Sequence, residues 1–168
     1  MPIHRSSMHS MAKEIERKFL LKDDSWRSLA EGCYYCQGYI PTQGKQTVRA
    51  RIAGDQGYLT LKGPAKGISR SEFEYKIPIA DAQSILNELC VQPLIEKYRY
   101  RISYGDVVWE VDEFLGDNQG LILAEVELTH AEQVIQLPAW IDQEVTGDPR
   151  YYNSNLVRYP FKHWPERQ

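Results

Sequence analysis

Basic residues two positions apart are the feature of this sequence best suited to chemistry. They occur as Arg49-Ala-Arg51 and as Lys97-Tyr-Arg99-Tyr-Arg101. Residues two apart on a strand share one face, so each run presents its cations side by side. Guanidinium groups stay charged and bind phosphate oxygens in bidentate geometry. These runs therefore favour a ligand rich in phosphate groups.

Acidic residues repeat with the same spacing, as in Glu14-Ile-Glu16 and Glu125-Val-Glu127. Carboxylates without accompanying histidine or cysteine suit a hard divalent ion. Mg²⁺ or Mn²⁺ is typically bound by one or two carboxylates together with substrate phosphates. The 4 histidines lie in terminal segments or at the end of an expected strand, and we do not expect them to bind metal. Cations and carboxylates together indicate a site for a metal-bound chain of phosphates.

The charged pattern extends over seven segments and places eight cations and eight anions on one face of the expected strands. The cations are Lys18, Arg49, Arg51, Lys62, Lys76, Lys97, Arg99 and Arg101. The anions are Glu14, Glu16, Glu72, Glu74, Glu110, Asp112, Glu125 and Glu127. Like charges repel on an exposed strand face, so we expect these residues to face one another inside a closed structure. Gly63-Pro-Ala-Lys-Gly67 lacks the spacing of a phosphate-binding loop, so the phosphate contacts must come from strands.

Alternation of apolar and polar residues predicts the strands that position these charges. They are expected at residues 13–21, 33–40, 46–54, 57–63, 70–79, 94–104, 107–115 and 121–129. This order favours a mainly β fold, a closed eight-stranded antiparallel β-barrel tunnel whose interior holds one small ligand. The apolar faces then point outward, where a few helices or a second copy in a homodimer must cover them.

Few helices are expected. One runs from a cap at Asp81 to about Cys90, and a weaker one begins near Asp24 or Ser25. Short helical turns are expected after Thr129 and after residue 153.

Length and composition narrow the class of protein. The chain of 168 residues is long enough for one domain with its own core, assigned to residues 11–160 between loosely held tails at 1–10 and 161–168. The net charge of −3 does not favour a nucleic-acid partner. No apolar run approaches the about 20 residues of a membrane span, and no secretory signal is apparent. The 3 cysteines are expected to be reduced thiols of a cytoplasmic protein.

The segment Glu14-Ile-Glu16-Arg-Lys18 resembles the ExExK signature of the CYTH domain, or triphosphate tunnel metalloenzyme, family. The resemblance continues in order through Gln37-Gly-Tyr39, Val48-Arg-Ala-Arg51, Leu59-Thr-Leu-Lys62, Ser71-Glu-Phe-Glu74, Glu96-Lys-Tyr-Arg99-Tyr-Arg101, Trp109-Glu-Val-Asp112-Glu-Phe114, Glu125-Val-Glu127 and Glu144-Val-Thr-Gly-Asp-Pro-Arg150-Tyr-Tyr-Asn153. It implies an eight-stranded antiparallel barrel that hydrolyses or cyclises triphosphate compounds with Mg²⁺ or Mn²⁺.

The resemblance also implies roles for individual residues. The metal ligands it implies are Glu14, Glu16, Glu125 and Glu127, with Asp112 as a fifth. The phosphate ligands it implies are Lys18, Arg49, Arg51, Lys62, Arg99 and Arg101, with Arg150 closing one end. The residues expected to orient these cations from behind are Glu72, Glu74, Lys76 and Glu110.

Lys97 and Tyr39 are the candidates for direct participation in catalysis. Neighbouring cations would lower the pKa of Lys97 and make it a base for water, whereas bound phosphates would raise it. A base and a plain phosphate ligand are therefore both open interpretations. Tyr39 either holds Lys97 or the water, or packs at the rim of the barrel.

Several substrates fit such a barrel. The compact chain favours inorganic triphosphate, cleaved to pyrophosphate and phosphate, because little chain remains to recognise a base. Thiamine triphosphate, a nucleoside triphosphate, or ATP cyclised by a class IV-type adenylate cyclase are alternatives on the same fold. A non-catalytic polyphosphate-binding module is the alternative from a different class. Loss of a metal carboxylate would favour that module, and none is missing.

Overall fold

Strands make up most of the regular structure in the computed structural model, which describes the backbone of residues 4–5 and all of residues 13–165. The strands are β1 (His4–Arg5), β2 (Lys13–Leu21), β3 (Gly32–Ile40), β4 (Thr47–Ala53), β5 (Gln56–Lys62), β6 (Ser69–Ile77), β7 (Ile95–Tyr104), β8 (Val107–Phe114), β9 (Ile122–Glu127) and β10 (Ile141–Glu144). The helices are α1 (Ile79–Glu88) and α2 (Asn153–Arg158), with 3₁₀ helices at Ser25–Ser28, Gly116–Asn118, Pro149–Tyr151 and Phe161–His163.

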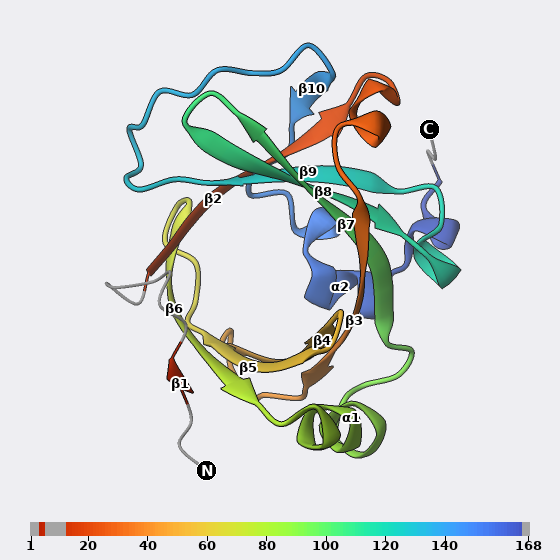
Figure 1. The fold of residues 1–168 in the computed structure, drawn as a ribbon. Helices are drawn as coiled ribbons and strands as arrows, with labels where there is room; N and C mark the ends of the chain where they lie inside the picture. Colours follow the sequence, from red (N-terminus) through yellow and green to blue (C-terminus); the bar gives the residue numbers. More distant parts are fainter. Residues whose placement is uncertain (1–3, 6–12, 166–168) are drawn as a thin grey trace.

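Strands β2 to β9 form a closed antiparallel barrel (Figure 1). The sheet runs in the order β6-β5-β4-β3-β7-β8-β9-β2, and β2 pairs with β6 to complete the ring. Glu16 lies opposite Glu127 where β2 pairs with β9, and Lys13 lies opposite Ser71 where β2 pairs with β6. The predicted eight-stranded barrel is therefore confirmed, and all eight predicted strands are present.

Two-residue turns set the register in two pairs of neighbouring strands, β4–β5 and β7–β8. Gly54 joins β4 to β5 and Gly105 joins β7 to β8, each with a φ near +60° that favours glycine. The β7–β8 turn aligns Arg99 with Asp112 and Arg101 with Glu110. Cations and anions of neighbouring strands thus meet directly inside the barrel.

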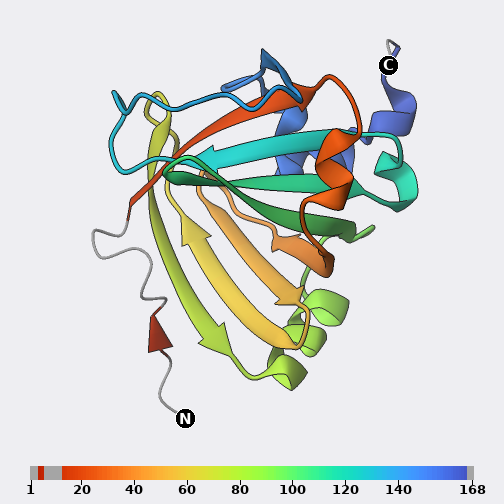
Figure 2. The ribbon, with the colours of Figure 1, turned by 45° about the horizontal axis from the view of Figure 1, so that its top comes forward.

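Helix α1 covers the outer face of one side of the barrel. Ala82 and Leu86 are fully buried on its inner side, and Leu86 packs against Ala50 of β4. The helix begins at Ile79 rather than at the expected cap Asp81, because Pro78 ends β6. Figure 2 shows α1 outside the strands, as expected for a helix covering an apolar sheet face.

A second apolar cluster lies outside β2, β7, β8 and β9. Trp109 of β8 is fully buried there, with its ring centroid 6.0 Å from that of Trp140. Trp26, in the 3₁₀ helix after β2, packs its ring 5.0 Å from Tyr100 of β7. The segment that leads into β10 completes the cover through Trp140 and Ile141. The short turn expected after Thr129 is a single hydrogen-bonded turn, in which the backbone N–H of Gln133 donates to the carbonyl oxygen of His130 at 3.2 Å and the Gln133 side chain accepts from the backbone N–H of Thr129.

The inward-facing side chains change from charged to apolar toward one end of the barrel. Ile95 lies two residues before Lys97 on β7, and Leu123 lies two before Glu125 on β9, so each pair shares a face. Ile95 and Leu123 are buried in one cluster with Val145, Tyr151, Leu156, Val157, Phe161 and Trp164. Figure 1 shows α2 within the ring of strands. The C-terminal segment thus closes this end of the barrel.

This packing corrects the expectation of a loosely held C-terminal tail for residues 161–165, the part of the expected tail 161–168 that the structure describes. Phe161 and Trp164 are each 6% exposed, and Trp164 Nε1 donates to the carbonyl oxygen of Tyr159 at 3.1 Å. Residues 166–168, like 1–3 and 6–12, lie outside the described part of the chain. Within the expected N-terminal tail, His4–Arg5 pairs with β6. No helix among the described residues is long and apolar enough to cross a membrane.

Candidate active site

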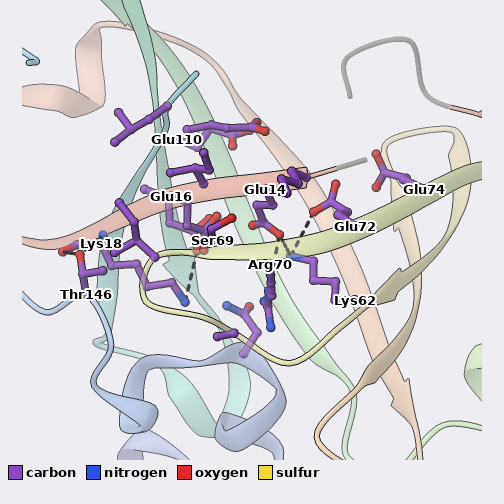
Figure 3. A pocket seen from close by; sticks show the side chains of 18 of the residues that line it. Glu14, Glu16, Lys18, Lys62, Ser69, Arg70, Glu72, Glu74, Glu110 and Thr146 are labelled. Carbon is purple, nitrogen blue, oxygen red and sulfur yellow. Dashed lines mark hydrogen bonds and ion pairs between the residues drawn. The ribbon is translucent and has the colours of Figure 1, made fainter. Parts of the chain in front are cut away.

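The barrel encloses a cavity of about 1340 Å³, lined by the strands and, at its closed end, by Thr146, Gly147, Tyr152, Asn153 and Ser154. Of the sixteen charged side chains expected on the inward faces, all but Asp112 line this cavity. Figure 3 shows Lys62 of β5 reaching toward Glu14 of β2 and Glu72 of β6, with Glu16 further along β2. So many charges in one enclosed space require mutual pairing or a charged ligand.

Lys97 is buried at the closed end of the cavity. Its Nζ donates to Asp112 Oδ2 at 2.7 Å and to Asn153 Oδ1 at 3.1 Å. Burial, reinforced by Arg99 and Arg51 and opposed by Asp112, lowers the pKa of Lys97 to about 7. A lysine with this pKa is partly neutral near pH 7 and can accept a proton. The lowered pKa of Lys97 therefore favours the base over the plain phosphate ligand.

Asp112 holds the two central cations from behind. Its carboxylate accepts from Arg99 Nε at 2.7 Å and Nη2 at 2.8 Å, and from Lys97 Nζ at 2.7 Å. Burial opposes ionisation, but Arg99 and Lys97 hold the pKa of Asp112 far below its usual range. Both oxygens are engaged and the side chain is fully buried. This placement does not suit the expected fifth metal ligand and makes Asp112 a counter-ion instead.

Arg51 reaches the cavity from β4. Its Nε donates to Gln37 Oε1 at 2.9 Å, and its guanidinium lies 5.0 Å from the ring centroid of Tyr35. The guanidinium of Arg99 lies 5.1 Å from the same ring. Burial and the neighbouring charges of Arg49 and Arg99 lower the pKa of Arg51 to about 10, so it remains a cation at neutral pH.

Arg49, also on β4, is oriented by a buried threonine and a carboxylate. Its Nη2 donates to Thr60 Oγ1 at 3.2 Å and to Glu74 Oε1 at 3.4 Å. Thr60 Oγ1 in turn donates to Glu74 Oε1 at 3.1 Å. These contacts suit the orienting role expected of Glu74.

Lys62 contacts two neighbouring carboxyl groups whose pKa values are shifted in opposite directions. Its Nζ lies 2.6 Å from Glu14 Oε2 and 3.4 Å from Glu72 Oε2 (Figure 3). Burial opposes ionisation of Glu14, yet Lys62 and a hydrogen bond from Glu72 hold its pKa well below the usual range. Burial and Glu14 raise the pKa of Glu72 to about 8. Glu14 is thus the ionised member of the pair.

Glu16 and Glu127 face each other across the β2–β9 pairing. Burial, Glu125 and Glu14 raise the pKa of Glu16 well above its usual range. Burial, Glu14 and Glu110 raise the pKa of Glu127 to about 7. Crowded carboxylates of this kind are stabilised by a divalent cation, and their oxygens suit Mg²⁺ or Mn²⁺.

Protein ligands alone do not complete a metal site. Within residues 13–165, no three histidine, cysteine, aspartate or glutamate side chains converge as a ready-made metal cluster. Mg²⁺ commonly takes only one or two carboxylates and completes its octahedron with water and substrate phosphates. The donor set of β2 and β9 therefore fits a metal ion that is held jointly with a phosphorylated ligand.

Lys18 links β2 and β9 to the C-terminal segment. Its Nζ donates to the carbonyl oxygen of Tyr151 at 3.1 Å and lies 3.7 Å from Glu125 Oε1. The same nitrogen lies 5.2 Å from the ring centroid of Tyr152. The C-terminal segment is therefore a wall of the charged cavity as well as its apolar closure.

Arg101 and Lys76 lie at the solvent-accessible parts of the cavity. Arg101 Nη1 contacts Glu110 Oε2 at 2.5 Å, and Arg99 Nη1 contacts the same oxygen at 3.3 Å. Lys76 lines the cavity from an exposed position on β6. Glu110 thus suits the orienting role expected of it.

Arg150 lies away from the cavity, contrary to the expectation that it grips phosphate at one end. Its Nη2 donates to Asp148 Oδ2 at 2.8 Å, and its guanidinium lies 5.5 Å from the ring centroid of Trp164. The acidic neighbour two residues back holds the side chain on the outer surface. Tyr39 does line the cavity, but its hydroxyl accepts from Gln37 Nε2 at 2.9 Å, and Lys97 is held by other residues.

The alternation of charged residues in the sequence does not identify several residues of the site, because they are neutral or lie near the end of a strand. Gln37 and Thr60 are fully buried, and Asn153 contacts Lys97 from α2. Arg70 lines the cavity and lies 3.7 Å from Glu14 Oε2. Gln37 and Asn153 occur within the segments that resemble the family, which is the one signal that points to them.

Known proteins with similar sequences and structures place this cavity in a family. The family model for the CYTH domain matches residues 12–152. The chain is 53% identical over 156 residues to an inorganic triphosphatase of Acetivibrio thermocellus, covering 93% of this chain and 100% of that protein. It is 34% identical over 152 residues to an inorganic triphosphatase of Nitrosomonas europaea, covering 86% and 96%.

A solved structure of an inorganic triphosphatase superposes with a TM-score of 0.58 at 31% identity, covering 86% of this chain and 93% of the other. The matches cover most of this chain and nearly the whole length of these relatives. The chain belongs to the CYTH domain family, the triphosphate tunnel metalloenzymes.

Proposed function

We propose that this protein hydrolyses inorganic triphosphate to pyrophosphate and phosphate inside the barrel, with Mg²⁺ or Mn²⁺ as cofactor. The observation that carries the proposal is the enclosed cavity in which buried arginines and lysines of β2, β4 and β7, together with half-buried Lys62 of β5, meet a carboxylate cluster. The relatives named inorganic triphosphatases support the choice of substrate. Among the aromatic side chains that line the cavity, the ring of Tyr35 already packs against the guanidinium groups of Arg51 and Arg99, which a base stacking there would have to displace.

The phosphate ligands are assigned from cations that line the cavity. They are Lys18, Arg49, Arg51, Lys62, Arg99 and Arg101. The divalent ion is assigned to Glu14, Glu16, Glu125 and Glu127, and when bound it supplies Lewis-acid neutralisation of phosphate charge. Asp112 is left out of this set because Lys97 and Arg99 occupy both of its oxygens.

Lys97 is assigned as the base. Its neutral amine takes a proton from a water molecule, whose oxygen forms a bond to the terminal phosphorus while the bond from phosphorus to the bridging oxygen breaks. Pyrophosphate leaves with the electron pair of that bond. Arg51 and Arg99, fixed by Gln37, Tyr35 and Asp112, stabilise the charge on the phosphoryl oxygens without needing to reorganise.

A comparison of substrates tests this function. Phosphate release is measured with triphosphate, ATP and thiamine triphosphate, each with Mg²⁺ or Mn²⁺ and with chelator. We expect metal-dependent release that is fastest with triphosphate. Faster turnover of ATP or thiamine triphosphate would make that compound the substrate instead. Formation of cyclic AMP from ATP would indicate a cyclase. Tight binding without turnover would indicate a polyphosphate-binding module.

Two properties of the whole protein are also proposed. We assign it to the cytoplasm, because Cys33, Cys36 and Cys90 are free thiols, and we expect no nucleic-acid or membrane partner. A homodimer remains the prediction for the outer apolar faces, of which Leu61 and Phe73 are each 39% exposed.

A further inference from the structure

A chain of hydrogen bonds connects Arg51 to Lys97 across the closed end of the cavity. Arg51 Nε donates to Gln37 Oε1 at 2.9 Å. Gln37 Nε2 donates to Asn153 Oδ1 at 3.3 Å and to the hydroxyl of Tyr39 at 2.9 Å. Asn153 Oδ1 also accepts from Lys97 Nζ at 3.1 Å. The two neutral amides, Gln37 and Asn153, join the phosphate-binding side of the site to the base.

The direction of every bond in this chain follows from Arg51. An arginine side chain only donates, so Gln37 must turn its carbonyl oxygen toward Arg51 and its NH₂ group toward Tyr39 and Asn153. Asn153 must then present its carbonyl oxygen to that NH₂ group. The same oxygen faces Lys97, so the lysine amine donates to Asn153.

This direction matters for a lysine that accepts a proton. A neutral amine has two N–H groups and one lone pair. Asp112 Oδ2 and Asn153 Oδ1 are acceptors for the two N–H groups, and the lone pair is left for the cavity that Lys97 lines. Because Asn153 is neutral, it fixes the amine without adding a second carboxylate that would favour the protonated form.

We propose that Asn153 is a positioning residue that orients the amine of Lys97 toward the attacking water, and that Gln37 fixes the orientation of Asn153. This inference rests on the proposed function, in which Lys97 is the base. It adds α2 to the catalytic apparatus, since Asn153 is the first residue of that helix.

Replacing Asn153 by aspartate tests the contact with little change of shape. The charged groups that already act on Lys97 are Asp112 on β8, Arg99 on β7, Arg51 on β4 and Glu125 on β9. A carboxylate at position 153 adds one more negative charge within hydrogen-bond distance. We expect Asn153→Asp to raise the pKa of Lys97 by about one pH unit or more.

Asn155→Asp is the matched control. It makes the same substitution two residues further along α2, where the side chain donates to the carbonyl oxygen of Pro149 at 2.8 Å rather than to Lys97. Lysine side-chain NMR on the metal-free proteins measures the pKa of Lys97 directly, and the pH dependence of kcat/KM reports it in the active enzyme. We expect Asn153→Asp, and not Asn155→Asp, to move both to higher pH. An unmoved pKa in Asn153→Asp, or an equal movement in Asn155→Asp, would overturn the proposal.

Asn153→Ala and Gln37→Leu test the relay. We expect Asn153→Ala to lower kcat by about tenfold or more, the loss of one hydrogen bond to a catalytic group, with KM changed less than about threefold. Gln37→Leu should lower kcat in the parent enzyme and by a smaller factor in the Asn153→Ala background, because the part of its effect that runs through Asn153 is already lost there while the part that runs through Arg51 remains. Fully additive effects would remove Gln37 from the relay, and melting curves show whether each variant folds.

The NMR measurement separates this inference from the proposed function. If the parent protein does not hydrolyse triphosphate, the function fails whatever Asn153 does. If it hydrolyses triphosphate and Asn153→Asp leaves the Lys97 pKa unchanged, the positioning role of Asn153 fails and the function stands.

Discussion

At the scale of single residues, the site depends on how burial and neighbouring charges decide which side chains are protonated. Lys97 and Asp112 form an ion pair at 2.7 Å, yet burial and two arginines lower the pKa of Lys97 to about 7. Glu14 is held ionised by Lys62, whereas Glu127 is driven toward its protonated form by burial and other carboxylates. The same residue types thus serve as base, phosphate ligand or metal ligand according to their neighbours.

The pH dependence of the reaction tests the role of Lys97. Below its pKa the amine is protonated and cannot accept a proton, so kcat/KM should rise with pH to a plateau, with a midpoint near 7 in the free enzyme. Lys97→Arg keeps a cation that does not deprotonate in this range. We expect it to lower kcat by at least about a hundredfold and to abolish the enzyme's ascending limb.

Ionisation of the substrate also makes kcat/KM depend on pH, and that dependence persists in Lys97→Arg. The difference between the pH profiles of the parent enzyme and of Lys97→Arg therefore reports the ionisation of Lys97. Near-parent kcat together with an unchanged limb would remove Lys97 from the catalytic residues and leave it a phosphate ligand.

The metal assignment is tested by charge removal on the paired strands. Glu16→Gln and Glu127→Gln keep the side-chain shape but remove negative charge where β2 meets β9. Activity should fall by about two orders of magnitude or more, while the melting temperature is kept or raised because repulsion between carboxylates is relieved. Titration with Mn²⁺ should show weaker binding in both variants. Parent-like turnover by both in Mg²⁺ would contradict the assignment.

At the scale of elements, β-strand alternation positions the cations and the C-terminal segment completes the wall. Lys18 is held by the carbonyl oxygen of Tyr151, and Lys97 by the side chain of Asn153. Tyr151 in turn packs its ring 5.2 Å from that of Trp164. The apolar closure of the barrel therefore sets the position of two charged side chains.

Removing Trp164 should expose this dependence. Trp164→Ala deletes a buried aromatic side chain, which typically costs about 3–5 kcal/mol of unfolding free energy. We expect a lower melting temperature and a decrease in kcat even where the variant remains folded. Tyr104→Ala, at a residue that is 40% exposed, is the control and should change the melting temperature and kcat much less. Equal effects of the two substitutions would contradict the closure role of Trp164.

Sequence reasoning succeeded for elements whose pattern is local and failed where distant segments meet. The alternation of residues along β2 and β7 was sufficient to predict these strands, the face that points inward and most of the site residues, because side chains two residues apart on a strand share a face. Burial of Trp164 could not be predicted, since it depends on the apolar end of a barrel built from β7, β8 and β9. Arg150 was misplaced because its partner Asp148 is close in sequence and competes with the cavity.

At the scale of the whole molecule, one closed barrel separates a charged cavity from apolar outer faces. The pattern of charged residues could not identify Gln37 and Asn153, because these side chains are neutral and act through hydrogen bonds to Arg51 and Lys97 on other elements. The barrel explains why eighteen positively and negatively charged side chains are tolerated together, because they line one cavity that suits a metal-bound polyanion.

Hydrolysis of triphosphate in water enriched in ¹⁸O, followed by phosphorus NMR of the products, tests the central claim most directly. Attack of water on the terminal phosphorus predicts equal amounts of phosphate and pyrophosphate, with ¹⁸O in the phosphate alone. The reaction should require Mg²⁺ or Mn²⁺ and should be nearly absent in Lys97→Arg. No release from triphosphate in the presence of either metal, or ¹⁸O found in pyrophosphate instead of phosphate, would contradict the account.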